Sequence, residues 1–359
     1  MSDERRLGSS LIAEIEKTAA DVRRDVRIME VCGTHTVELR KQGIHSVLPA
    51  SIRLISGPGC PVCVTPAGYI DNALALAESG RAVVATFGDM LKVPGSTGRS
   101  LSSLTGRGAV RMVYSPRELA GIAGSSPLPV VFLAVGFETT IPTIVSALLE
   151  ARRKGLTNLF IYTAFKTVPQ ALRFLLSNPV HAIDGFLLPG HVSVIIGADA
   201  YGFLEKDDGR PGVVTGFEPV EMLLGILMVL RQIRGGEHRV ENAYPRAVRP
   251  EGNRLAQDLI SRTLEPRSDA WRGLGVIPGG ALALRSELRE SDAEAVFSLP
   301  PARDYEAPGC LCSRVISGMA LPTECCLFGS RCTPDDPVGP CMVSSEGTCA
   351  AYFRYGAMQ

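Results

Sequence analysis

The sequence contains no long run of like charge and no apolar segment of membrane-spanning length. Lysine plus arginine equals aspartate plus glutamate at 37 each, so we expect neither nucleic acid nor an anionic membrane surface as a partner. The longest apolar run, MLLGILMVL at 222–230, is too short to cross a bilayer and is expected to form a buried helix. No apolar signal segment follows the charged residues MSDERRLGSS, which favours a cytoplasmic protein.

The common nucleotide-binding patterns are also missing. There is no G-x-x-x-x-G-K-[ST] loop and no G-x-G-x-x-G after an expected strand, so no nucleotide cofactor of the usual types is expected. The chain has 359 residues, of which 45% are hydrophobic, enough to bury the cores of two or three domains. The sequence therefore predicts a folded globular protein whose chemistry comes from other residues.

Cysteine is absent from the long middle of the chain and concentrated toward its two ends. Cys32, Cys60 and Cys63 lie near the N-terminus. The other seven, all within the last fifty residues, are Cys310, Cys312, Cys325, Cys326, Cys332, Cys341 and Cys349. In a reducing compartment, ten cysteines need a role other than structural disulfides. We therefore predict two separate cysteine sites.

Between about residues 27 and 235, short apolar runs alternate with longer amphipathic stretches. The expected strands are 27–31, 52–56, 81–87, 129–135, 158–164, 183–188 and 212–217, and the expected helices are 66–79, 115–124, 139–153, 168–177 and 218–234. This alternation predicts an α/β protein with parallel sheets covered by helices; a mixed α+β chain is the alternative. A new start near Pro127 predicts two doubly wound halves, 1–126 and 127–235, followed by a helical, cysteine-rich domain at 236–359.

Chemically unusual residues follow six of the expected strands. Each such loop alone contains little more than the glycine, proline and small polar residues that any strand-to-helix turn requires. Because parallel strands end at one edge of a sheet, however, six such loops together predict a shared cleft, either at one sheet edge or between two sheets. Its candidate residues are Cys32, His35, Cys60, Cys63, Asp89, Lys92, Glu138 and His191.

Cys60 and Cys63 form a C-x-x-C pair at the start of an expected helix, in GPGCPVC. Amides at a helix N-terminus lower thiol pKa values, so the pair can exchange electrons as dithiol and disulfide or bind a soft metal. The alternative is a pair of inert buried thiols. Cys32 alone is weaker evidence, and its neighbour His35 can contact a substrate or cap the following helix.

The cysteines of the last fifty residues lie among glycine and proline residues that form turns. This sequence pattern is typical of a segment that folds around a metal centre. Four thiolates suit zinc or an iron–sulfur cluster. Because the two C-x-x-C knuckles of a zinc ribbon are missing, the spacing favours a [4Fe–4S] cluster, and the third domain is expected to carry it. Spacing alone does not select the four ligands among seven cysteines.

Five motifs together, in this order, resemble those of the hydrogenase maturation factor HypD family. They are EVCGTHT, SGPGCPVCVTP, TFGDMLKVPGS, GFETT and PGHVSVIIG, followed by the cysteine-rich tail. The resemblance implies a scaffold on which the Fe(CN)2(CO) unit of [NiFe]-hydrogenase is assembled, with redox activity rather than conventional turnover. It also implies work with a HypC-type chaperone and cyanide supply through HypE and HypF. The family is similar to ferredoxin-dependent thioredoxin reductases in pairing a [4Fe–4S] cluster with a redox-active cysteine couple.

The resemblance also assigns roles to individual cysteines. It implies Cys32 as the principal iron ligand, with Cys60 and Cys63 as a redox-active pair, either of which can also touch iron. In the tail it implies Cys312 and Cys341 as a second dithiol able to pass electrons between the cluster and the cleft, so that the two cysteine groups lie close together, and it assigns no role to Cys326. The implied cluster ligands are Cys310, Cys325, Cys332 and Cys349.

Loop position suggests further donors that would orient the ligands of the iron. These are Thr34, His35, Thr36, Asp89, Glu138 and His191. Each of them can instead cap a helix. Two competing functions remain: an iron–sulfur thiol–disulfide oxidoreductase acting on a protein disulfide, and a zinc-containing adaptor protein.

Overall fold

The computed structural model describes residues 3–356, which form two separate β-sheets. The first sheet has the strand order β2-β1-β7-β8-β9, and all of its neighbouring strands are parallel. Its strands are β1 (Val26–Glu30), β2 (Ile52–Ser56), β7 (Gly185–Pro189), β8 (Gly212–Thr215) and β9 (Val240–Asn242). The parallel arrangement expected from the alternating pattern is therefore confirmed for this sheet.

The second sheet is mixed, with the order β10-β11-β6-β5-β3-β4. β6, β5, β3 and β4 are parallel, whereas β11 pairs antiparallel with both β6 and β10. Its strands are β3 (Val83–Thr86), β4 (Val110–Met112), β5 (Val130–Gly136), β6 (Leu159–Lys166), β10 (Leu264–Trp271) and β11 (Gly275–Leu284). The antiparallel edge was not expected from the sequence.

The two sheets are interleaved along the chain. After β1 and β2 the chain leaves the first sheet, builds β3 to β6 in the second, and returns with β7 to β9 before adding β10 and β11. A boundary at residue 126 therefore does not separate the sheets, and the segment 236–300 completes both of them rather than belonging to the cysteine-rich part. The order of apolar runs reveals strands but not which sheet each one joins. As independently folding units, the three ranges stay a prediction.

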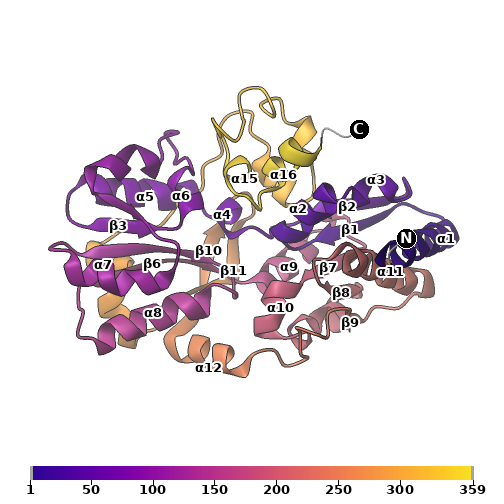
Figure 1. Ribbon diagram of the computed structural model, residues 1–359, viewed down its shortest axis with the longest axis horizontal. Helices are drawn as coiled ribbons and strands as arrows, with labels where there is room; N and C mark the ends of the chain where they lie inside the picture. Colours follow the sequence, from indigo (N-terminus) through magenta and orange to yellow (C-terminus); the bar gives the residue numbers. More distant parts are fainter. Residues whose placement is uncertain (1–2, 357–359) are drawn as a thin grey trace.

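Helices cover both faces of each sheet (Figure 1). On the first sheet, Ile28, Leu187 and Val213 pack against α1 and α11, while strand neighbours such as Met29 and Leu188 face α9 and α10. On the second, α5, α6 and α13 cover one face and α7, α8 and α12 the other. This inside-outside alternation is the doubly wound arrangement expected from strands buried on both faces.

The helices have the following bounds. They are α1 (Asp3–Val22), α2 (Gly33–Lys41), α3 (Ile44–Val47), α4 (Pro61–Val64), α5 (Ala67–Glu78), α6 (Gly88–Leu91), α7 (Leu119–Ser125), α8 (Ile141–Arg153), α9 (Val168–Leu176), α10 (Gly190–Ile196), α11 (Pro219–Gly235), α12 (Arg254–Thr263), α13 (Ala293–Phe297), α14 (Cys312–Ile316), α15 (Pro340–Val343) and α16 (Thr348–Tyr355). The apolar run 222–230 lies in α11 and is largely buried, as expected. Within residues 3–356, no helix is both long and apolar enough to span a membrane.

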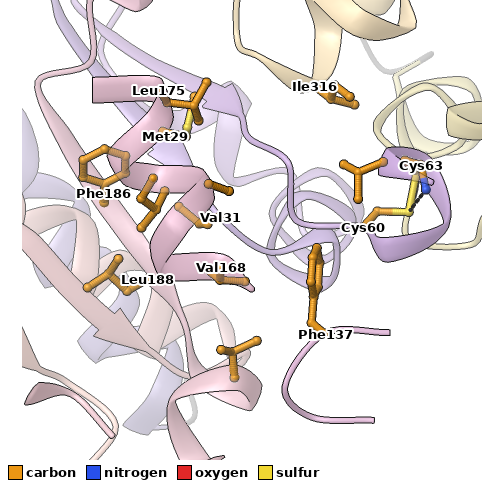
Figure 2. Close-up of a cluster of buried hydrophobic side chains, with 14 of the residues drawn as sticks. Met29, Val31, Cys60, Cys63, Phe137, Val168, Leu175, Phe186, Leu188 and Ile316 are labelled. Carbon is orange, nitrogen blue, oxygen red and sulfur yellow. Dashed lines mark hydrogen bonds between the residues drawn. A yellow bond between two sulfur atoms is a disulfide. The ribbon is translucent and has the colours of Figure 1, made fainter. Parts of the chain in front are cut away.

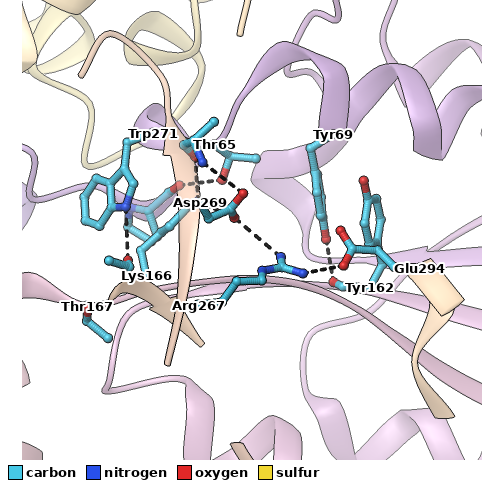
Figure 3. A network of polar contacts seen from close by, with 12 residues as sticks. Thr65, Tyr69, Tyr162, Lys166, Thr167, Arg267, Asp269, Trp271 and Glu294 are labelled. Atoms are coloured by element: carbon cyan, nitrogen blue, oxygen red, sulfur yellow. Dashed lines mark hydrogen bonds and ion pairs between the residues drawn. The ribbon is translucent and has the colours of Figure 1, made fainter. Parts of the chain in front are cut away.

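A buried polar network attaches the β10–β11 hairpin to the second sheet (Figure 3). The Lys166 ammonium, with none of its side chain exposed, donates to Asp269 at 2.8 Å and to the Ala270 carbonyl at 2.7 Å. Arg267 bridges Asp269 and Glu294. Burial lowers the pKa of Lys166, and the Asp269 carboxylate opposes this effect. The network therefore links β10 to the last residue of β6 across β11, which lies between these two strands in the sheet.

The cysteine-rich tail lies across the junction of the two sheets (Figure 1). In this view α15 and α16, drawn in yellow, sit above α4 and α2, the helices that follow the two N-terminal cysteine loops. Contacts between α16 and α2 and between α15 and α4 agree with the picture. The fold therefore brings the N-terminal cysteine loops and the C-terminal tail together over one edge of the first sheet.

Candidate metal and thiol site

The loops that carry Cys32 and Cys60 touch each other. They follow β1 and β2, which are adjacent and parallel, so both loops leave the sheet at the same edge. The Gly33 N–H donates to the Gly59 carbonyl at 3.1 Å. A Cβ atom at position 59 would lie 2.6 Å from the backbone N and Cα of Cys32, so the close approach requires glycine.

Cys60 and Cys63 form a disulfide across the first turn of α4, with 5.3 Å between their Cα atoms. Cys60 caps this helix, and its Sγ accepts the Cys63 N–H at 3.2 Å. Figure 2 shows the buried pair beside Phe137, which belongs to the loop after β5 in the other sheet. The pair therefore lies where the two sheets meet. As disulfide and dithiol, it can accept and release two electrons.

Cys32 is a buried thiol at the N-terminus of α2, with 8% of its surface exposed. Burial, and then the nearby Glu346 carboxylate, raise its pKa from 9.0 to about 11, although backbone amides of Thr34 and His35 favour the thiolate. At neutral pH the free side chain is therefore protonated. A metal cation supplies the positive charge that displaces this proton, so metal binding here releases a proton.

The tail contacts both N-terminal loops directly. The Thr34 hydroxyl donates to Glu346 at 2.7 Å, and a Cβ at position 33 would lie 2.4 Å from the Glu346 carbonyl oxygen. Cys63 Sγ lies 4.0 Å from the Pro340 carbonyl oxygen, one residue before Cys341. The Cys60–Cys63 pair also belongs to one continuous buried cluster with four of the tail cysteines, Cys312, Cys332, Cys341 and Cys349. The two cysteine groups predicted as separate sites are therefore neighbours.

Three tail thiols, Cys312, Cys341 and Cys349, could hold one metal ion, because their Sγ atoms lie within 4.8 Å of one another. Hydrogen bonds from Cys312 and then Cys341 lower the pKa of Cys349 to about 6, so this sulfur is largely a thiolate at neutral pH. The hydrogen bonds with Cys312 and Cys349 also raise the pKa of Cys341 well above its usual value. Hydrogen bonding within the trio therefore favours the thiolate form of Cys349, the form that binds a soft metal.

A small cavity of about 10 Å³ lies beside this trio. Its sulfur lining consists of Cys310, Cys312, Cys325, Cys332 and Cys349, and its other walls are apolar side chains such as Leu327 and Phe328. The Val338 N–H donates to Cys332 Sγ at 3.3 Å. Several thiols, apolar walls and an amide that donates to sulfur are features that fit an iron–sulfur cluster.

The predicted cluster ligands and the predicted dithiol share this space. All four implied ligands line the cavity, but so does Cys312 of the dithiol. The other dithiol member, Cys341, approaches Cys312 and Cys349 instead. The exposed Cys326 thiol donates to the Gly309 carbonyl at 3.7 Å, beside Cys325, whose thiol uses the same acceptor at 3.6 Å. The selection of four ligands therefore stays a prediction.

His35 points into the first sheet. Its Nε2 lies 3.0 Å from both the Gly216 carbonyl oxygen and the Thr215 hydroxyl, beyond the end of β8. Burial lowers its pKa to about 4, so the ring is neutral at pH 7. Its Nδ1 is buried and has no hydrogen-bond partner among residues 3–356. The ring is held through one nitrogen and leaves the other available, so its predicted role in orienting a ligand stays a prediction.

The remaining predicted donors have different surroundings. Thr36 donates to the buried Glu30 at 2.6 Å, and its hydroxyl also lies 3.4 Å from the Cys32 carbonyl oxygen. Asp89 is exposed and accepts from the Ser344 hydroxyl of the tail at 3.2 Å. His191 stacks on Phe217 with 3.9 Å between ring centroids. Lys92 is exposed, and it is the only candidate for which we find no link to the site in the described part of the chain.

Glu138 is the most unusual of these carboxylates. It follows β5 and is almost fully buried, and its Oε1 accepts the Val168 N–H at 3.0 Å. Its Oε2 is buried and has no partner within the described residues. Burial raises its pKa from 4.5 to about 7. The side chain can therefore hold or release a proton near neutral pH.

Comparison with known proteins identifies the family. The chain matches the family described as "HypD: Hydrogenase formation hypA family" over residues 6–356. This chain belongs to the HypD family. Its relatives include the "Hydrogenase expression/formation protein HupD" of Azotobacter chroococcum mcd 1, 44% identical over 98% of this chain and 94% of that protein. The "Hydrogenase maturation factor HypD" of Rhizobium leguminosarum bv. viciae is 44% identical over 99% and 95%, and that of Rhodobacter capsulatus 42% over 98% and 96%.

Two important residues of this HypD family member were missed by the sequence analysis. Glu346 joins the tail to the Cys32 loop, and Arg272 donates to the Val64 and Thr65 carbonyls just after Cys63. Glu346 lies in the cysteine-rich segment, where only the cysteines were considered as candidate site residues. Arg272 follows the sole tryptophan in a segment for which no strand was expected. No local pattern marks either residue, because their partners are hundreds of residues away in sequence.

Glu138 gives the HypD fold a pH dependence whose sign follows from its raised pKa. Between pH 4.5 and 7 the folded state keeps the proton that the unfolded state has lost, so the free energy of unfolding falls as pH rises through this window. The expected loss is on the order of 3 kcal/mol. In Glu138→Gln this contribution is absent, and the variant should show a flatter profile in urea titrations followed by Trp271 fluorescence. Parallel profiles for the two proteins would contradict the assignment.

Proposed function

We propose that this chain is the scaffold on which the Fe(CN)2(CO) unit of a [NiFe]-hydrogenase is assembled. The iron unit is its cargo, held by Cys32 as principal ligand with Cys60 or Cys63 beside it. The observation that carries the proposal is the meeting of thiols from both ends of the chain at one junction between two sheets. A hydrogenase maturation factor of this kind works with other maturation proteins rather than by conventional turnover.

The chemistry of the cargo agrees with the residues that face it. Cyanide and carbon monoxide are strong-field ligands that leave iron(II) low-spin and electron-rich, so the protein must hold the iron through soft anionic donors. Thiolates are such donors and carboxylates are not. Backbone amides of Thr34 and His35 at the start of α2 favour the Cys32 thiolate, the form that iron requires. Its raised pKa makes iron uptake favour higher pH, because the thiol must lose its proton.

A [4Fe–4S] cluster fits the tail, where Cys310, Cys325, Cys332 and Cys349 would hold it. When bound, it would supply electrons at low potential. The protein's own contribution is the Cys60–Cys63 disulfide, which takes up two electrons and two protons to become two thiols. Cys312 and Cys341 form a second dithiol beside it, and the contact of Cys63 with the residue before Cys341 supports this arrangement.

We propose two partners from the resemblance. A HypC-type chaperone would supply a further cysteine to the iron, and a HypE-type protein would donate cyanide. We propose work in the cytoplasm, where thiols stay reduced, with no nucleic acid or membrane as partner. The balanced charge of the chain agrees with the absence of a polyanionic partner.

A second function, an iron–sulfur thiol–disulfide oxidoreductase, is favoured by one observation. The disulfide and the tail thiols share one buried cluster, which is the arrangement that a disulfide reductase needs. This function requires turnover with a protein disulfide and no iron beyond the tail. It leaves Cys32, buried and protonated beside the disulfide, without a role.

One anaerobic preparation separates these functions. The protein is co-expressed with a HypC-type chaperone and analysed for iron, zinc and acid-labile sulfide, with infrared spectra in the region of cyanide and carbonyl stretches. The scaffold predicts about four cluster irons, additional iron and diatomic bands. Cluster iron without diatomic bands, together with disulfide turnover, would favour the oxidoreductase. Zinc without sulfide would exclude both.

His35→Ala tests the positioning role of the imidazole. Nδ1 of His35 is the free nitrogen, so we expect the variant to shift the cyanide or carbonyl infrared bands while iron stays bound through thiolates. His35→Gln, which retains hydrogen-bonding groups, should shift the bands less. Thermal unfolding serves as the control for lost packing. Unchanged bands at unchanged iron content would remove His35 from the site.

A further inference from the structure

Arg272 is a buried cation without a counter-charge. Only 5% of its surface is exposed, and its Nε donates to the Thr65 carbonyl at 2.9 Å. Its Nη2 is buried and has no hydrogen-bond partner, and it forms no ion pair with any carboxylate in residues 3–356. Burying a charge without a partner is costly, so such residues usually have a counter-ion. By contrast, the buried Lys166 nearby is paired with Asp269.

The same arginine lines a pocket of about 660 Å³. One wall is the loop 94–98, PGSTG, and another is the tail segment 330–338. Hydroxyl groups of Ser96, Thr97, Ser330 and Thr333 line it together with a second guanidinium, that of Arg331. The one carboxylate in the lining belongs to Asp336, which is exposed, so water screens its charge. The lining therefore offers two guanidinium groups and several hydroxyls to a bound group.

We infer that this pocket binds an oxyanion, the phosphate or carboxylate group of a small ligand. The Arg272 guanidinium is planar and presents paired N–H donors, which match two oxygens of such a group. Its low exposure strengthens the attraction because little water competes for the charge. Arg331 and the hydroxyls complete the donor set. This inference is independent of the scaffold function.

The location of the pocket connects the bound oxyanion to both thiol groups. The backbone N–H of Arg272 donates to the Val64 carbonyl at 2.8 Å, so the arginine holds the end of the helix that carries the disulfide. On the opposite wall, Val338 donates to Cys332 Sγ. An oxyanion in the pocket therefore contacts the segments that support the disulfide and one predicted cluster ligand.

The test measures binding of inorganic phosphate and of acetate to the full-length protein, prepared anaerobically. Thermal unfolding midpoints are recorded against sodium chloride at equal ionic strength, and affinities by titration calorimetry. We expect a saturable rise of the midpoint with at least one of the two anions. A rise with phosphate alone assigns a phosphate ligand, and a rise with acetate alone assigns a carboxylate.

Two variants and one control locate the effect. Arg331→Glu alters an exposed side chain in the pocket, and Arg272→Lys keeps the charge but removes the paired donors; each should weaken binding at least tenfold. Arg354→Glu makes the same charge change on an exposed arginine of α16 outside the lining and should bind as wild type. If Arg272→Lys does not fold, Arg331→Glu decides. No saturable rise, or the same rise in all variants from a general salt effect, would overturn the inference.

Discussion

Cys32→Ser is expected to remove the iron that carries cyanide and carbon monoxide from the junction between the two sheets. The iron of the tail should stay in place. A serine hydroxyl is a hard donor that stays protonated at neutral pH, so it cannot replace the thiolate that low-spin iron requires. The fold should tolerate the change, because residue 32 is the N-cap of α2 and serine is a preferred N-cap residue. We expect the cyanide and carbonyl bands of the co-expressed protein to fall at least tenfold.

The matched control for Cys32→Ser is Cys326→Ser. Cys326 is exposed and has no assigned role, so its replacement should change neither the infrared bands nor the sulfide content. Acid-labile sulfide reports on the tail in both variants and should remain at the wild-type level. Diatomic bands of normal intensity in Cys32→Ser would refute Cys32 as the principal ligand. Loss of sulfide in that variant would show that the two thiol groups are not independent metal sites.

The largest effect on stability is expected from Cys349→Ala. Cys349 is the tail thiol whose pKa is lowered to about 6, by hydrogen bonds from Cys312 and then Cys341, and it also lines the cavity. Without Cys349, both the trio with Cys312 and Cys341 and the sulfur lining of the cavity lose a member. We therefore expect acid-labile sulfide and tail iron to fall to background levels. The residues from 301 to 356 contain only short helices, so we expect the proposed metal centre to contribute much of their folding free energy. Protease sensitivity of this segment should therefore rise with the loss of iron.

Comparison with Cys326→Ser separates metal loss from a general effect of cysteine removal. Chelation of wild-type protein under anaerobic conditions should reproduce the protease sensitivity of Cys349→Ala. Full sulfide content in Cys349→Ala would remove this residue from the ligand set and favour Cys312 in its place, since Cys312 lines the same cavity. The experiment thus also addresses which four of the tail cysteines are used.

Among the described residues, the sequence predicted seven of the nine strands that have parallel partners, because periodicity is a local property, and it missed the short strands β4 and β9. The expected strand 52–56 matches β2, and the other expected strands lie within a few residues of those observed. The hairpin of β10 and β11 was missed, since PGGALAL contains glycine and proline that usually interrupt strands. Sheet membership was also missed, because pairing depends on contacts between distant segments rather than on the residues of a strand.

The sequence predicted the parts of the candidate site whose chemistry follows from residue type. It did not predict the parts that depend on contacts between residues far apart in sequence. Cysteines attract attention in any sequence, so Cys32, the C-x-x-C pair and the tail were found. The closeness of these groups was inferred only through the family resemblance. Contacts such as Thr34 with Glu346 are 312 positions apart in sequence, and no local pattern reports them. The unpaired state of Arg272 is likewise visible only after burial is known.

The interleaved order of the strands has a consequence for synthesis on the ribosome. The first sheet is complete only when residue 242, the end of β9, has been translated. The helices α15 and α16, which cover the loops of Cys32 and Cys60, follow about a hundred residues later. Domains usually fold as units from the N-terminus as they emerge from the ribosome. Here Cys32 and Cys60 become covered only after the last helix, α16, has been synthesised. Until α15 and α16 have been synthesised, nascent chains should therefore expose the Cys32 and Cys60 thiols to solvent.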